Sequence, residues 1–281
     1  MDSAQPIDRF LARLEERDGY QPLSDAKLVS LGKVDRYLTI QEDRNVVALG
    51  AVAEHTRGSD ARHWSAETAV DPSMRFAEFE DVVLSRTLDL VPKGLTATVW
   101  SRRPSLDGAL IRAGFSPHRS LVQMRVTLPL DALAAAETTP MQTSEEDVLI
   151  AINRAAFGTH PEAASLDASE LAVLRAQNWF DLEGIRLHRT DTTVDAFCWT
   201  KVHRGGEGEI YRIGVSPSAQ GRGLGKAMVL AGFEYLSQHR GCSTGTLWVD
   251  ESNTPAMRLY ASIGMEVTAR NREFARSTGS A

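Results

Sequence analysis

The sequence predicts an α/β fold made of two copies of one strand–helix domain in tandem. Three observations support this prediction: strands and helices alternate in the second half, the first half repeats their order, and landmarks recur at a nearly constant spacing. The prolines that follow a predicted strand, Pro72 and Pro217, lie 217 − 72 = 145 residues apart. The glycines that end a predicted helix, Gly114 and Gly264, lie 264 − 114 = 150 residues apart. Two independent and nearly equal spacings indicate a repeated domain.

The second half alternates segments of strand and helix type. Segments rich in β-branched and aromatic residues between turn residues predict strands, and helical segments that stop at a glycine predict helices. In chain order, the predicted elements are a strand at 194–202, a strand at 209–215, a helix at 223–239, a strand at 246–249 and a helix at 255–263. This order is typical of an α/β domain.

The first half repeats this order. Its predicted elements are a strand at 45–54, a strand ending at 68–70, a helix at 74–90, a strand at 95–100 and a helix at 106–113. The stretch from Pro129 to Asp147 is small, polar and acidic, and it predicts a linker between the halves. We therefore expect an N-terminal domain over residues 1–135 and a C-terminal domain over residues 141–281.

Composition excludes several classes of protein. With 31 basic and 37 acidic residues the net charge is −6, whereas a general nucleic-acid binder carries a concentrated basic face. No segment approaches the roughly 20 apolar residues of a membrane-spanning helix. Cys198 and Cys242 cannot form a disulfide framework, and His160 and His203 lack metal-ligand spacing and are expected to be ordinary residues. We expect a cytoplasmic monomer with no metal, nucleic-acid partner or membrane partner.

The segment 220–226, QGRGLGK, predicts an anion site, because it follows a predicted strand and opens a predicted helix. Glycines let backbone amides approach a ligand, and the unpaired amides of a helix N-terminus carry partial positive charge. Together with Arg222 and Lys226 they suit a pyrophosphate. Lys226 precedes Ala227 rather than the Ser or Thr of a Walker loop, and the glycine spacing does not match G-x-G-x-x-G. The alternative is a glycine-rich helix start that binds no ligand.

The segment 208–228, GEIYRIGVSPSAQGRGLGKAM, resembles the signature of the GCN5-related N-acetyltransferases (GNAT): Q/R-x-x-G-x-G/A after a strand that ends V-x-P. Asn253, Ala256, Tyr260 and Gly264 also fit a downstream motif of that family. The resemblance implies two tandem GNAT-fold domains, each with a mixed, mostly antiparallel sheet flanked by helices. It also implies that acetyl-CoA is bound by Ile213, Gly214, Val215, Gln220, Gly221, Arg222, Gly223, Leu224, Gly225, Lys226, Asn253, Thr254, Pro255, Ala256, Met257 and Arg258.

Within this family, a tandem chain with one active half resembles the mycothiol synthases. The resemblance is most specific at NRAAFGTHPE from Asn153, at WTKVH from Trp199, and at GEIYRIGV. That group transfers acetyl from acetyl-CoA to the cysteinyl amine of desacetylmycothiol, a cysteinyl-glucosaminyl-inositol, and forms mycothiol. The resemblance implies substrate contacts at Asp25, Glu162, Lys201, Glu209 and Trp248, although the group often has tyrosine at the last position.

Glu209 and Tyr260 are the candidate catalytic residues. An α-amino group has a pKa of about 7.7–8.0, so a base that removes its proton helps the attack. Glu209 is the candidate base and Tyr260 the candidate acid for the departing thiolate, while backbone amides of the strand ending at Val215 polarise the thioester carbonyl. The alternatives are that Glu209 is a solvated residue at a strand start and that Tyr260 is a half-buried aromatic.

The first half lacks these residues, which predicts a catalytically silent domain. At the two offsets it carries other residues at the key positions: Arg75 for Gln220, Glu78 for Gly223, Glu80 for Gly225, Trp64 for Glu209 and Leu110 for Tyr260. Carboxylates at the phosphate loop would repel a pyrophosphate.

Two alternative functions stay open from the sequence. The chain is either a GNAT acetyltransferase for another amine, such as a peptide N-terminus or a polyamine, or a non-catalytic module that binds acyl-CoA. The presence of Glu209 and Tyr260 in only the half that keeps the loop argues against the second alternative.

Overall fold

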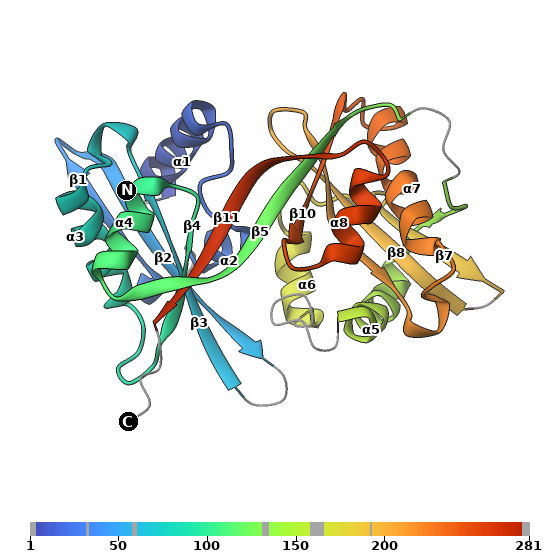
Figure 1. Cartoon of the computed structure of the whole chain (residues 1–281), viewed down its shortest axis with the longest axis horizontal. Coiled ribbons are helices and arrows are strands. Elements are labelled where there is room, and N and C mark those ends of the chain that lie inside the picture. The colour runs from blue at the N-terminus through green and yellow to red at the C-terminus, as the bar shows by residue number, and fades with distance from the viewer. Residues whose placement is uncertain are drawn as a thin grey trace. The chain divides into compact units, whose positions relative to one another are not determined.

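The computed structural model describes residues 4–31, 34–57, 61–130, 135–157, 166–191 and 193–276 (Figure 1). Its strands follow the hydrogen-bonded order β1-β2-β3-β4-β11-β5-β10-β9-β8-β7-β6, an eleven-stranded mixed sheet. The chain divides into two compact units. Unit 1 comprises Met1–His55, Ala61–Ser120 and Asn271–Ala281, and unit 2 comprises Thr56–Asp60 and Leu121–Arg270. The predicted α/β class is confirmed.

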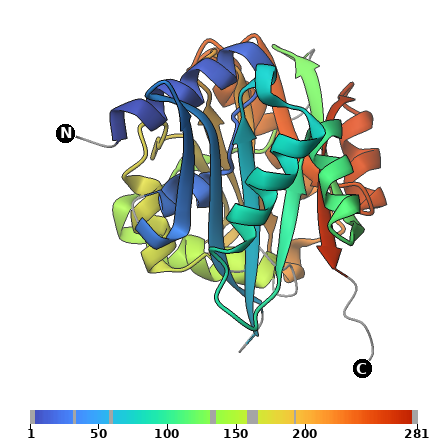
Figure 2. The same cartoon turned by 90° about the vertical axis from the view of Figure 1, so that its left-hand side faces the viewer.

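Unit 1 combines a mixed sheet with four helices among its described residues. Its elements are α1 (Ala4–Asp18), α2 (Asp25–Ser30), β1 (Tyr37–Glu42), β2 (Asn45–Arg57), β3 (Ala61–Val70), α3 (Ala77–Leu88), β4 (Ala97–Ser101), α4 (Pro104–Arg112) and the first part of β5 (Phe115–Thr127). β1 pairs antiparallel with β2, and β3 pairs parallel with β4. Figure 2 shows α3 lying across these strands, and Leu84 of α3 packs with Val99 of β4 in the core.

Unit 2 has helices on both faces of its sheet. Its elements are β6 (Thr139–Pro140), α5 (Glu146–Phe157), α6 (Ala168–Arg175), β7 (Ile185–Thr190), β8 (Thr193–Val202), β9 (Gly208–Val215), α7 (Leu224–Gln238), β10 (Thr244–Asp250), α8 (Thr254–Ala261) and the first part of β11 (Glu266–Arg276). Ala196 and Cys198 of β8 pack with α7 and α8, whereas Phe197 and Trp199 pack with α5 and α6. β8 is therefore apolar at consecutive positions because both of its faces are buried.

The predicted repeat is confirmed in the order of elements. Each unit contains a strand, a short 3₁₀ turn, a helix, a strand and a second helix, and in each the two strands run parallel. The 3₁₀ turns start at Pro72 and Pro217, and the second helices at Pro104 and Thr254, which preserves the offsets of 145 and 150 residues.

The two copies differ where the 3₁₀ turn joins the first helix. Residues 220–223 make this connection in unit 2, but only residues 75–76 make it in unit 1. The helix starts are therefore 224 − 77 = 147 residues apart, and the carboxylate that aligns with Gly225 is Glu78, not Glu80. The predicted helix at 74–90 is also wrong at its start, because Phe76 is extended at φ −109° and ψ 159°.

The compact units do not coincide with the predicted domain limits of 1–135 and 141–281. The chain leaves unit 1 at Ser120, inside β5, and residues from Asn271 onward belong to unit 1 again. Strand pairing explains the return, because Arg272 of β11 pairs antiparallel with Ser101 of β4. The stretch predicted as a linker also contains β6 and the start of α5, since Pro140 pairs with Arg186 of β7.

Candidate active site

A β-bulge in β9 determines which side chains face each side of the unit 2 sheet. The register between β8 and β9 shifts between Trp199 and Thr200, which leaves Tyr211 as an extra residue in β9. Ile210 and Ile213, three positions apart, therefore both pack in the core beneath α7, whereas Tyr211 packs on the opposite side. Strand residues normally alternate with period two, so the Ile-x-x-Ile spacing is the sequence signal for this bulge.

β9 and β10 pair over only part of their length. Three parallel pairs join residues 208–210 to residues 245–247, but β9 continues to Val215 and β10 to Asp250. On its other side β9 stays paired with β8 as far as Val215. Within the described ladder, the edge of β9 that carries Ile213 and Gly214 therefore has no strand partner on the β10 side. An extended ligand can pair with such an edge as an added strand does.

The start of α7 has the geometry of an anion site. Gly221 and Gly223 both have φ of 78°, a left-handed conformation that favours glycine. Gly223 is the N-cap residue, and neither a side-chain cap nor an acidic residue occupies the first turn of α7. The first amides of the helix are thus left without a capping side chain, and they favour an anionic group.

Gln220 and Lys226 contact the protein on either side of this helix start. The Gln220 amide donates from Nε2 to the Val215 carbonyl oxygen at 3.1 Å, which closes the connection against the end of β9. Lys226 Nζ lies 3.2 Å from Ser262 Oγ, just after α8. Arg222 is exposed. The structure therefore gives Gln220 a role in shaping the loop, which does not test its predicted contact with the cofactor.

The start of α8 is held by its own cap. The Asn253 side-chain oxygen accepts a hydrogen bond from the Ala256 amide at 3.2 Å, and Pro255 occupies the first turn, where no amide hydrogen is needed. Ala256 and Met257 pack on the core beneath α7, and Arg258 is exposed, as is Thr254. Asn253 is thus explained as a helix cap, which does not test its predicted contact with the cofactor.

Glu209 lies in a polar cluster at the hairpin that joins β8 and β9. It pairs in register with Lys201 across the two strands and with Thr246 of β10. Its Oε2 lies 2.6 Å from Nε2 of His203. The Glu209 side chain is 11% exposed and that of His203 is 21% exposed. The reading of Glu209 as a solvated strand-start residue is therefore wrong.

Lys201 is buried against an aromatic cluster. Its Nζ lies 4.6 Å from the ring centroid of Trp179 and 5.5 Å from that of Tyr211. The Trp179 and Tyr211 rings are themselves 4.9 Å apart, and Trp199 completes the cluster. An ammonium held over aromatic faces is stabilised by cation–π attraction. The structure thus gathers Lys201 and Glu209 on one face of the sheet, beside tryptophan and tyrosine rings.

Tyr260 is buried in the core of unit 2, with 8% of the residue exposed. Burial raises the pKa of its hydroxyl to about 12, and the neighbouring Cys198 adds to the increase. Burial likewise raises the pKa of the Cys198 thiol to about 12. Tyr260 therefore stays protonated at neutral pH and can donate a proton or a hydrogen bond, whereas Cys198 stays a thiol.

The remaining predicted substrate residues lie in different places. Trp248 is on β10, opposite Gln123 of β5, and is partly buried. Asp25 opens α2 in unit 1, where its Oδ1 accepts a hydrogen bond from Gln21 at 3.2 Å. Glu162 lies outside the described residues. The sequence does not indicate that His203 contacts Glu209, because no spacing rule links position 203 to position 209 unless the hairpin between them is known.

Among the described residues, no group of three or more His, Cys, Asp or Glu side chains is placed to hold a metal ion. The helices that the structure describes include none that is both long and apolar enough to cross a membrane.

Comparisons with known proteins indicate the family of the chain. Residues 158–265 match the acetyltransferase (GNAT) family. The mycothiol acetyltransferase of Nocardia farcinica is 32% identical, over 94% of this chain and 90% of that protein. The enzyme of the same name from Thermomonospora curvata is 34% identical, over 92% and 89%.

Solved structures agree on the fold. A tandem GNAT protein from the clavulanic acid biosynthesis pathway superposes with a TM-score of 0.68 at 14% identity, covering 100% of this chain and 97% of that one. A GCN5-related N-acetyltransferase from Sphaerobacter thermophilus gives 0.63 at 22% identity, over 96% and 91%. The expected tandem GNAT fold is confirmed. The chain is an acetyltransferase, and it belongs to the mycothiol acetyltransferase family.

Proposed function

We propose that this protein transfers the acetyl group of acetyl-CoA to the cysteinyl amine of cysteinyl-glucosaminyl-inositol and so forms mycothiol. The observation that carries the proposal is the extent of the similarity: relatives named mycothiol acetyltransferase match 92–94% of this chain, in both units, and not only the half that carries the proposed catalytic residues. Similarity confined to the catalytic half would support an acetyltransferase without indicating its acceptor.

The cofactor site in unit 2 fits acetyl-CoA. The uncapped start of α7 suits a pyrophosphate, and the edge of β9 beyond Ile210 suits an extended, amide-bearing arm. The proposed cofactor residues are therefore those of the strand end 213–215, the loop and helix start 220–226 and the start of α8 at 253–258. Acetyl-CoA supplies the activated thioester when it is bound.

Glu209 and Tyr260 carry the proposed proton transfers. The amine nitrogen attacks the thioester carbonyl carbon directly, and the carbon–sulfur bond breaks without a covalent enzyme intermediate. Glu209 accepts the proton that the amine loses. Tyr260, which is protonated at neutral pH, donates to the departing thiolate. General-base help of this kind is typically worth about 10²–10⁴ in rate.

The acceptor is proposed to contact Asp25, Glu162, Lys201, Glu209 and Trp248. Lys201 is the best supported of these by geometry, because its ammonium lies among Trp179 and Tyr211 on the same face as Glu209. Mixed polar and aromatic surfaces suit a sugar-bearing ligand better than a polyamine, which would favour a cluster of carboxylates.

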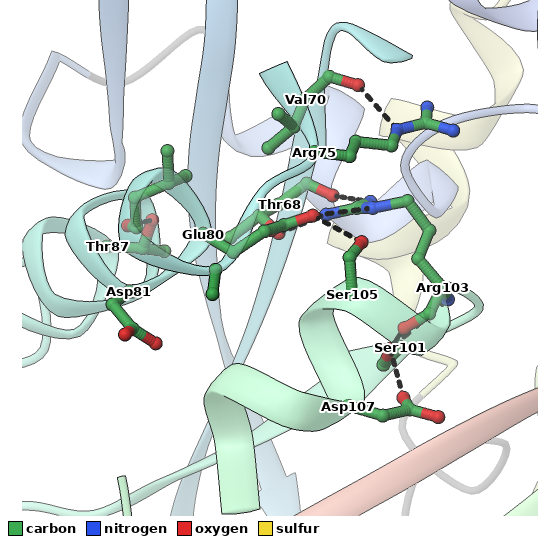
Figure 3. A network of polar contacts seen from close by, with 12 residues as sticks. Thr68, Val70, Arg75, Glu80, Asp81, Thr87, Ser101, Arg103, Ser105 and Asp107 are labelled. Carbon is green, nitrogen blue, oxygen red and sulfur yellow. Dashed lines mark hydrogen bonds and ion pairs between the residues drawn. The ribbon is translucent and has the colours of Figure 1, made fainter. Parts of the chain in front are cut away.

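Unit 1 is proposed to be catalytically silent, because its counterpart of the cofactor site is filled by its own side chains (Figure 3). Arg103, the N-cap residue of α4, aligns with Asn253 at the 150-residue offset. It donates to the Thr68 carbonyl at 2.7 Å, and Thr68 aligns with Ile213 of the predicted cofactor strand. In unit 1 an arginine side chain therefore binds the strand carbonyl whose counterpart in unit 2 belongs to the proposed cofactor site.

The Arg103 charge is balanced by Glu80 in the first turns of α3. Two guanidinium nitrogens lie 3.3 and 3.2 Å from the Glu80 oxygens, and Ser105 Oγ donates to the same carboxylate at 2.8 Å. Glu80 is completely buried. The positions of the base and acid hold Trp64 and Leu110, which are also buried. Arg103, Glu80 and Ser105 therefore bond to one another at the counterpart of the proposed pyrophosphate site.

The test is direct assay of acetyl-CoA consumption with cysteinyl-glucosaminyl-inositol, with cysteine alone, with a peptide N-terminus and with spermidine. We expect the pseudodisaccharide to have a kcat/KM at least about 100-fold higher than the others, because its sugar and inositol groups make binding contacts that the simpler amines lack. Equal turnover of simple amines would favour the alternative acetyltransferase. Binding of acetyl-CoA with no turnover of any amine would favour a non-catalytic module.

A further inference from the structure

We propose that His203 is a positioning residue for Glu209, and that its imidazole holds the carboxylate in the orientation that accepts the proton of the amine. The proposal rests on the proposed function of Glu209 as the base. It starts from one contact, in which Nε2 of His203 lies 2.6 Å from Oε2 of Glu209.

The hairpin fixes both ends of this contact. The His203 amide donates to the Glu207 carbonyl at 2.9 Å, and the Gly206 amide donates to the His203 carbonyl at 2.9 Å. Gly206 takes a φ of 79°, which allows the tight turn. Val202 pairs with Gly208 and Lys201 with Glu209 in the adjoining ladder. The hairpin therefore holds the backbones of His203 and Glu209 at a defined separation.

Burial of Glu209 makes its carboxylate depend on this contact for its orientation. Glu209 is 11% exposed at its side chain, so water contributes little to holding its carboxylate. A neutral imidazole that donates Nε2–H to Oε2 satisfies one carboxylate oxygen and leaves Oε1 to accept the proton of the amine. Bonds that orient a reacting group in this way typically contribute about 10–100-fold.

Other charged groups surround the pair. Lys201 reaches the same face from β8, but its ammonium lies over the rings of Trp179 and Tyr211. Glu207, in the hairpin turn, forms an ion pair with Arg125 of β5. Thr246, the β10 neighbour of Glu209, is neutral. Arg204, next to His203, is exposed and is screened by solvent. Among the described residues, His203 is therefore the side chain that contacts the Glu209 carboxylate directly.

The experiment compares His203→Gln with His203→Ala by measuring kcat and the KM for acetyl-CoA at pH 8. Glutamine keeps a neutral N–H donor at about the reach of Nε2, whereas alanine removes the donor. We expect H203A to lose about 10-fold or more in kcat, with little change in the KM for acetyl-CoA. We expect H203Q to recover most of this loss.

His188→Gln is the matched control. His188 is a second histidine of unit 2, on β7, and its Nδ1 contacts the Glu137 carbonyl at 3.0 Å. This variant should have the wild-type kcat. An unchanged kcat in H203A, or an H203Q variant as slow as H203A, would overturn the proposal.

Glu209→Gln separates this proposal from the one on which it rests. If E209Q keeps the wild-type rate, Glu209 is not the base and both proposals fail. If E209Q is slow but H203A is not, only the role of His203 fails. If both residues act as one unit, adding His203→Ala to E209Q should cost less than about two-fold, because the contact is already lost.

Discussion

The Gln220 side chain donates to the Val215 carbonyl at 3.1 Å, and this bond folds the loop before α7 back onto the strand that precedes it. Unit 1 repeats the bond at the equivalent positions, since Arg75 Nε donates to the Val70 carbonyl at 3.0 Å. The remaining guanidinium of Arg75 pairs with Asp18 of α1. Both units thus have a hydrogen bond that ties this loop to the preceding strand. Only in unit 2 is the bonded residue followed by glycines, which leave the helix start exposed.

Gly223→Ala is expected to weaken acetyl-CoA binding at least about 10-fold, because the left-handed N-cap conformation disfavours a side chain and the helix start must shift. Isothermal titration measures the dissociation constant. Gly241→Ala is the matched control: Gly241 also has a positive φ, 68°, and a Cβ there would also meet open space, but it follows the other end of α7. Both variants should lose about 1–2 kcal/mol of unfolding free energy, and only G223A should lose affinity. Equal affinities in the two variants would contradict an anion site at this helix start.

Glu80→Gln is expected to destabilise unit 1 by about 3 kcal/mol, because it leaves the buried Arg103 guanidinium without a compensating charge. Urea denaturation measures the loss. The KM for acetyl-CoA should stay within about two-fold of wild type, since the pair lies in the proposed silent unit. Titration of the wild type should give one acetyl-CoA per chain, and a stoichiometry of two would refute the proposal that unit 1 is filled by its own side chains.

Tyr260→Phe is expected to lower kcat about 10–100-fold, because the departing thiolate loses its donor. It should also change stability at alkaline pH. The pKa of Tyr260 is about 12 in the folded chain against 10.0 for a free tyrosine, so the unfolded chain releases this proton first and the unfolding free energy falls as pH rises from 10 to 12. The wild type should therefore lose up to about 2–3 kcal/mol more than Y260F between pH 8 and pH 12, measured by urea denaturation. Equal losses in the two proteins would exclude a buried, protonated Tyr260.

The folded protein is expected to resist alkylation at both cysteines. Burial raises the pKa of Cys198 to about 12 and also raises that of Cys242, and the thiolate is the reactive form. Mass spectrometry after iodoacetamide treatment at pH 8 should find no label in the native state and two labels in urea. Rapid labelling of native Cys198 would show that the core beneath α7 is open to solvent.

Local sequence signals determined much of unit 2. Several features depend only on backbone conformation within a few residues, so the sequence alone predicts them. They are the helix-ending glycines, the proline after each strand and the loop at 220–226. Glycines at the left-handed positions 221 and 223 have the φ that only glycine adopts readily. The repeat was equally readable, because its landmarks recur along the chain.

Only the tertiary structure decided what depends on distant pairings. The return of β11 to unit 1 joins Arg272 to Ser101, and no local pattern predicts a partner so far away. The bulge at Tyr211 and the hairpin after Val202 bring His203 to Glu209, and the fold of unit 1 brings Arg103 to Glu80. These contacts join side chains whose own neighbours in sequence carry no sign of them, because register and packing, not local propensity, set their distances.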